Sequence, residues 1–205
     1  MSKPRNLGVV VAGYVASAVV YFQLLGQQAI DRLGDAPIGL LFLGLPTFAG
    51  AVSMLLGNLL ERDQTIPGDE LSVETCQRIV SRLVVFMIVL HGFVLTALLG
   101  PASWMYRLVF LAVGGTLIGI GNLLPRTRPN SVIGIRIQRA VTNRLTWIRL
   151  HRVTGRVTVG AGIGIVAAAF LPRIAADALF SLVPLAAFGV LGAYMLKLGS
   201  KRPSH

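Results

Sequence analysis

Long apolar runs dominate this chain, and short clusters of charged residues separate them. Six runs of roughly 20 residues lie at positions 7–25, 37–60, 79–99, 104–124, 157–171 and 176–196, and about 20 apolar residues suffice for a helix to cross a bilayer. Only 13% of the chain is charged, against 54% that is apolar, whereas a soluble domain carries about 25% charged residues. The pattern predicts an all-α, polytopic membrane bundle of six transmembrane helices.

Lysine and arginine are distributed unequally between the loops that would join these helices. With both termini in the cytoplasm, 16 of the 19 basic residues face inward, as the positive-inside rule requires. We therefore expect a multi-pass protein of the plasma membrane with cytoplasmic N- and C-termini. The net charge of +11 then fits an anionic inner leaflet as partner, and direct binding of nucleic acid is not predicted.

The densest cluster of charge is a segment over residues 121–156, which has eight arginines and no acidic residue. Prolines at 125 and 129 predict a turn leaving the fourth span. Residues 137–152 return to a helical pattern, with an apolar stripe of Ile137, Val141, Leu145 and Ile148. This pattern predicts an amphipathic interfacial helix between the fourth and fifth spans.

Two domains are expected from this organisation. Residues 1–75 would form an N-terminal transmembrane hairpin and a cytoplasmic loop, and residues 76–205 a four-span domain that contains the arginine-rich segment. Residues 77–83 and 151–157 share a pattern that fits a parallel repeat of helical hairpins, although chance matching in such a chain is an equal alternative. Gly115 with Gly119, and Gly160 with Gly164, have the spacing that lets the fourth and fifth spans approach closely.

Several residues around the arginine-rich segment occur in a recognisable order. In this sequence they are Gly121-Asn122, Pro125-Arg126, Asn130, Gly134-Ile135-Arg136, Trp147, His151-Arg152 and Gly155. In these positions and spacings the chain resembles the SdpI family of bacterial membrane proteins. The resemblance implies immunity or resistance to a membrane-active antimicrobial peptide toxin. It also implies a receptor role, in which a cytoplasmic repressor is held at the membrane, and a relative without any toxin is a further alternative.

A binding site is predicted at the inner face of the bundle. Asn122, Arg126, Asn130, Arg136, His151 and Arg152 are expected to converge there in one polar cluster. The full set of candidate binding residues is Asn122, Arg126, Arg128, Asn130, Gly134, Arg136, Trp147, His151, Arg152 and Arg156. The alternative is that each arginine reaches separately to lipid phosphates, as interfacial arginines commonly do.

The ionisable residues favour a non-enzymatic protein. No acid lies in the arginine-rich segment to serve as a base or metal ligand, and His91, His151 and His205 are far apart in sequence. No catalytic residue, metal or cofactor is therefore predicted. A small transporter, proton-linked if it uses the intramembrane His91, is the main alternative, with a hydrogen bond to a neighbouring helix as the simpler role for this histidine. A phospholipid-handling enzyme is a further alternative.

Overall fold

The computed structural model describes residues 6–26, 40–62, 70–99, 104–130, 132–135, 137, 140 and 142–200. These residues are almost entirely helical, and no β-strand occurs among them. A π-helical turn (Leu40–Gly44) precedes α2, and a 3₁₀ turn (Leu124–Arg126) follows α4. The long helices are α1 (Leu7–Gly26), α2 (Leu45–Arg62), α3 (Glu70–Leu99), α4 (Met105–Leu123), α6 (Arg144–Ala168) and α7 (Arg173–Ser200).

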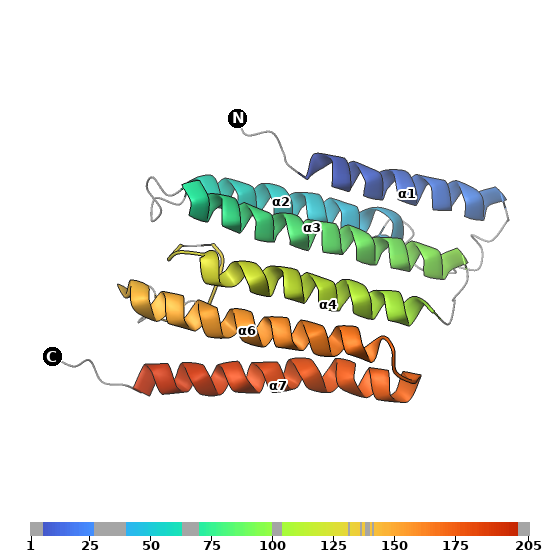
Figure 1. Ribbon diagram of the computed structural model, residues 1–205. Helices are drawn as coiled ribbons and strands as arrows, with labels where there is room; N and C mark the ends of the chain where they lie inside the picture. Colours follow the sequence, from blue (N-terminus) through green and yellow to red (C-terminus); the bar gives the residue numbers. More distant parts are fainter. Residues whose placement is uncertain are drawn as a thin grey trace.

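The helices lie side by side along one common direction (Figure 1). Helix α3 packs against α1, α2 and α4, and α6 lies between α4 and α7. The end of α4, the start of α6 and the end of α7 share one end of the bundle. The domain boundary expected after residue 75 falls within α3, which begins at Glu70, and the division into two domains stays a prediction.

The outward faces of the helices are apolar, which confirms a multi-pass membrane protein. Five helices are long and apolar enough to cross a bilayer: α1, α2, α3, α4 and α7. Large side chains such as Ile174, Phe188 and Phe22 are 87%, 74% and 68% exposed, and a soluble monomer rarely presents so much continuous apolar surface. The hydrophobic effect therefore favours lipid around this bundle.

Helix α6 corresponds to the fifth expected span, and it is not among the helices that are long and apolar enough to cross a bilayer. Its 25 residues give a length of about 37 Å, which exceeds the hydrocarbon thickness. Arginines and threonines in its first half lower its hydropathy, yet it packs along both α4 and α7. Six spans, with α6 as the fifth in order, therefore stay a prediction together with the cytoplasmic termini.

Glycines allow α4 and α6 to approach closely, as the sequence predicts, but they are different glycines. A Cβ on Gly114 would lie 2.6 Å from the carbonyl oxygen of Gly162, and one on Gly155 would lie 2.6 Å from that of Gly121. Both pairs are therefore direct backbone contacts. Gly115 and Gly160 meet nothing within 4 Å, so the expected Gly-x-x-x-Gly faces do not form this interface.

The prediction of one continuous interfacial helix over residues 137–152 is wrong. Asn143 has an extended backbone (φ −130°, ψ 109°), and its side chain accepts hydrogen bonds from the N–H groups of Leu145 and Thr146. This N-cap starts α6 at residue 144, so that the first turns of α6 continue without a break into the expected fifth span. Before the cap, Ala140 N–H donates to the Ile137 carbonyl; residues 138, 139 and 141 lie outside the described residues.

Candidate functional site

Trp147 holds the first turns of α6 against the chain that leaves α4. Its side chain is fully buried, and its indole N–H donates a 3.0 Å hydrogen bond to the carbonyl oxygen of Thr127. The ring also stacks on His151, one turn later, with 4.0 Å between ring centroids and 18° between ring planes. A buried indole needs such a polar partner, and the bond fixes residue 127 over the start of α6.

The loop after α4 is folded by its own side chains. The Asn130 side-chain oxygen accepts hydrogen bonds from the N–H groups of Val132 (2.9 Å) and Ile133 (2.6 Å). The amide nitrogen of the same side chain donates to the Arg128 carbonyl at 2.8 Å. Thr127 Oγ1 donates to the Leu124 carbonyl at 2.7 Å. Asparagine commonly stabilises turns in this way, so Asn130 shapes the loop and does not offer its amide to a ligand.

His151 is buried where this loop crosses α6. Its Nδ1 lies 3.0 Å from the Trp147 carbonyl oxygen, and because a carbonyl only accepts, Nδ1–H is the donor. Its Nε2 is buried with no hydrogen-bond partner among the described residues. That atom faces Gly134, whose φ is +121°, and a Cβ on Gly134 would collide with it. Only glycine fits this position without strain.

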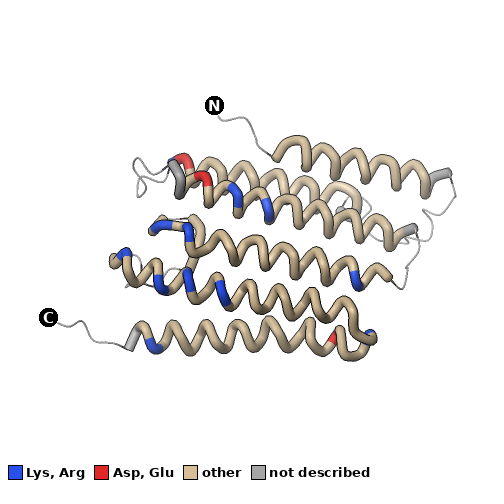
Figure 2. Tube along the Cα trace, viewed as in Figure 1, with Lys and Arg blue, Asp and Glu red and all other residues tan. Residues whose placement is uncertain are grey.

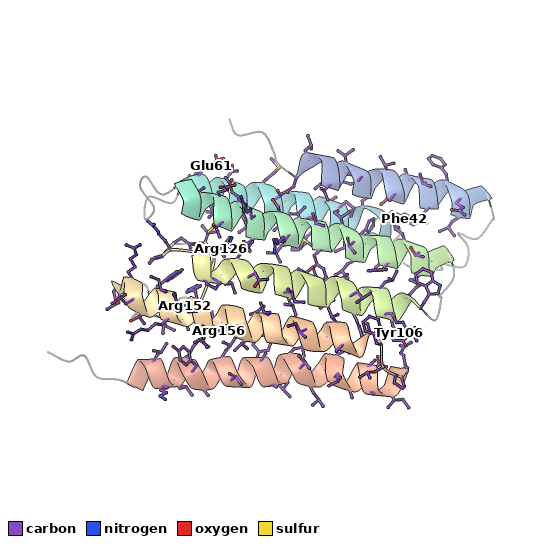
Figure 3. The ribbon with its side chains drawn as sticks, viewed as in Figure 1. Phe42, Glu61, Tyr106, Arg126, Arg152 and Arg156 are labelled. Carbon is purple, nitrogen blue, oxygen red and sulfur yellow. The ribbon has the colours of Figure 1, made fainter. Side chains whose placement is uncertain are left out.

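The structure therefore brings together four of the predicted site residues and separates others. Asn130, Gly134, Trp147 and His151 form one packed unit, which we call the loop–helix cap. The predicted site residues whose side chains are exposed are Asn122, Arg126, Arg128, Arg152 and Arg156. Basic residues gather at the end of the bundle where α6 begins (Figure 2), and Arg126, Arg152 and Arg156 lie there (Figure 3). Arg136 lies outside the described residues.

A physical reason separates the two groups. Burying an unpaired guanidinium is very costly, and the segment 121–156 supplies no carboxylate to pair with one. Asn130 and Trp147 can be buried because their side-chain polar groups bond to nearby backbone, and His151 bonds to backbone through Nδ1. The arginines instead make a cationic surface around the cap, which favours phosphate or carboxylate groups of a partner or of lipid.

His91 is the second candidate, and it lies far from the cap in α3. It is fully buried, with Nε2 at 2.7 Å from Ser17 Oγ of α1. Ser17 Oγ lies 2.6 Å from the Phe42 carbonyl oxygen and 2.9 Å from that of Gly13. The hydroxyl proton goes to one of these carbonyls, so His91 Nε2–H donates to Ser17. The hydrogen bond to a neighbouring helix, which was the simpler prediction for His91, is confirmed.

Sequence reasoning missed two residues that position these sites. Ser17 is one of several small residues in an apolar run, and nothing in the run marks it as a partner of His91. Thr127 contributes its backbone carbonyl to Trp147, which no side-chain motif reveals. The π-helical turn at Leu40–Gly44, which contains Phe42, is likewise invisible in the hydropathy pattern.

Comparison with known proteins places the cap in a family segment. Residues 126–197 match the model of the SdpI/YfhL protein family. This segment runs from the 3₁₀ turn after α4 through α6 and most of α7, so it contains all four cap residues. No curated protein and no solved structure matches the chain significantly. The resemblance predicted from the sequence is confirmed over residues 126–197, and in this C-terminal segment the chain is similar to the SdpI/YfhL protein family.

Proposed function

We propose that this protein is a bacterial plasma-membrane receptor that binds a membrane-active antimicrobial peptide and gives the cell immunity or resistance to it. The observation that carries the proposal is that the family segment folds into a built cap, with exposed arginines around it. A segment that served only as an anchor would need the positive charges but not the buried hydrogen bonds of Asn130 and Trp147.

In this role the cap and the arginines do different work. The cap fixes the start of α6 against the end of α4, so that the exposed guanidinium groups of Arg126, Arg152 and Arg156 stand at defined places. Such groups bind carboxylates or phosphates in bidentate geometry. The arginine-bearing end is the cytoplasmic one in this proposal, where a repressor carrying acidic groups is the partner. The function is binding alone, and no covalent bond is made or broken.

Protection is tested in living cells. The full chain is expressed in a sensitive bacterium, which is then challenged with a panel of membrane-active peptides. We expect at least one peptide to need a several-fold higher inhibitory concentration. Replacing Arg126 and Arg152 together by glutamine should remove this protection at unchanged protein level. Arg107→Gln, at the opposite end of the bundle, is the matched control and should keep it.

Two results would contradict the proposal. The first is full sensitivity to every peptide in the panel while the protein is present in the membrane. The second is equal loss of protection in the Arg107→Gln control, because the effect would then reflect total charge and not the arginines around the cap. Arg136→Lys adds a sharper test, since lysine keeps the charge but loses the bidentate geometry.

A proton-linked carrier is the second candidate, and His91 favours it. The imidazole is buried in α3 beside Ser17 of α1, and its Nδ1 has no hydrogen-bond partner in the described part of the chain. Buried ionisable residues within spans often belong to transport pathways. Proteoliposomes that contain a pH-sensitive dye separate the candidates: proton movement on addition of the protective peptide, lost in His91→Gln, would favour the carrier over the receptor.

A further inference from the structure

A groove between α3 and α4 lies outside the cap and opens on the surface that faces lipid. Its volume is about 390 Å³. At one end the Arg82 guanidinium of α3 lies directly on the backbone of Gly119 in α4, where any side chain would collide with it. The Ser81 hydroxyl lines the same end. Arg82 is exposed, so its charge is presented to whatever occupies the groove.

The remainder of the groove is mainly apolar, with Thr116 as a further polar residue in its lining. Val85 lines it on α3, and Leu111, Ala112 and Gly115 line it on α4. From Gly119 to Leu111 the helix rises by about 12 Å, so the groove runs from the polar end toward the middle of α4. A positive end joined to an apolar floor of this length matches a phosphate joined to an acyl chain.

Arg82 has no acidic partner in the described residues that could neutralise it. The nearest described carboxylate along α3 belongs to Glu74, which already pairs with Arg78 at 2.8 Å. Arg82 contacts Gly119, which lies about 10 Å before Arg126 along the helix axis. The Arg82 guanidinium is therefore nearer the middle of the bundle than the exposed arginines at its end. An arginine at such depth is costly unless an anion or water reaches it, and basic pockets between spans are known to bind lipid headgroups.

We propose that this groove binds one anionic phospholipid of the surrounding bilayer. Its phosphate accepts hydrogen bonds from the Arg82 guanidinium, and one acyl chain lies along the apolar floor. The lipid is anionic because a zwitterionic headgroup would bring a second positive charge toward Arg82, and Glu74 is already paired with Arg78. The site lies on α3 and α4, so its lipid binding can be measured independently of any peptide.

The test uses the full chain in nanodiscs that hold equal amounts of phosphatidylglycerol and phosphatidylcholine with the same acyl chains. The protein is then released from the nanodiscs, and the phospholipid that remains bound to it is quantified by native mass spectrometry. We expect phosphatidylglycerol to be enriched, and Arg82→Gln to lower that enrichment about fivefold. Gly115→Leu fills the floor, where nothing lies within 4 Å, and should reduce bound lipid without disturbing the fold.

Matched controls separate this site from general surface charge and from added bulk. Arg78→Gln removes a charge one turn away, and Gly160→Leu adds the same side chain at another open glycine, on α6; both should bind lipid as the original chain does. Equal loss in Arg78→Gln, or no loss in either groove variant, would overturn the proposal. Complete displacement of the lipid by soluble glycerol phosphate would also overturn it, because the floor would then contribute nothing.

Discussion

Replacing Gly134 by alanine should destabilise the loop–helix cap through two separable effects. The first is backbone strain, because φ at this position is +121°, and a residue with a side chain held in such a region costs about 1–3 kcal/mol. The second is a collision of the new Cβ with His151 Nε2. The imidazole cannot easily move away, since it is fully buried and stacked on Trp147, and overpacking of this kind costs about 1–3 kcal/mol.

A double-mutant cycle with His151→Ala measures the second effect alone. Removing the imidazole gives the Cβ introduced by Gly134→Ala the space it otherwise lacks, so the steric cost disappears while the backbone strain stays. We therefore expect the double variant to be less destabilised than the sum of the single variants, by about 1 kcal/mol or more. The free energy of unfolding is followed in detergent by tryptophan fluorescence in a Trp104→Phe background, in which Trp147 is the remaining tryptophan.

The control for this cycle is Gly57→Ala, at a helical glycine with nothing within 4 Å of its Cβ position. It should be neutral or slightly stabilising, because alanine favours a helix over glycine by about 1 kcal/mol. If Gly134→Ala leaves the unfolding transition that Trp147 fluorescence reports unchanged, the positive φ does not constrain the loop. If the two single effects simply add, His151 Nε2 does not face Gly134 and the reasoning fails.

Three further predictions address the helices. Gly114→Leu should disrupt the contact with Gly162 and lower the stability of the bundle by several kcal/mol, whereas Gly115→Leu, one residue later, should be tolerated. Thermal unfolding in detergent compares the two variants. Equal effects would refute the assigned interface. Asn143→Ala removes the N-cap of α6 and should cost about 1 kcal/mol, measured by the same unfolding; no loss would mean that water caps the helix equally well. Reporters fused after Arg128 should be active in the cytoplasm and one after Ala102 outside it, and the reverse result would exclude the proposed topology.

The placement of the helices was largely predictable, because it depends on local hydropathy. A run of apolar residues near the bilayer thickness must form its own backbone hydrogen bonds, so it becomes a helix whatever its neighbours are. The expected runs at 7–25 and 104–124 accordingly agree with α1 and α4 within two residues. The start of α6 was not predicted, since the pattern of residues 137–152 is helical on both sides of Asn143 and the side chain alone does not reveal that it caps.

Which residues meet across helices was decided only by the tertiary structure. A Gly-x-x-x-Gly spacing gives two small residues on one face, but it does not say which face turns toward the neighbour. Gly114 and Gly115 are adjacent in sequence and about 100° apart around the helix, and only Gly114 contacts α6. The same limit hid the Ser17–His91 hydrogen bond, whose partners are 74 residues apart.

The sequence by itself determined that this chain is a helical membrane protein with its basic residues concentrated in the segment 121–156, since length, apolarity and charge are properties of the chain alone. The tertiary structure decided which members of that segment are buried. Asn130, Trp147 and His151 are enclosed because backbone carbonyls and N–H groups of the loop and of α6 come within hydrogen-bonding distance of them. Arg126, Arg152 and Arg156 stay exposed, because the segment that carries them has no carboxylate and burying an unpaired guanidinium is costly.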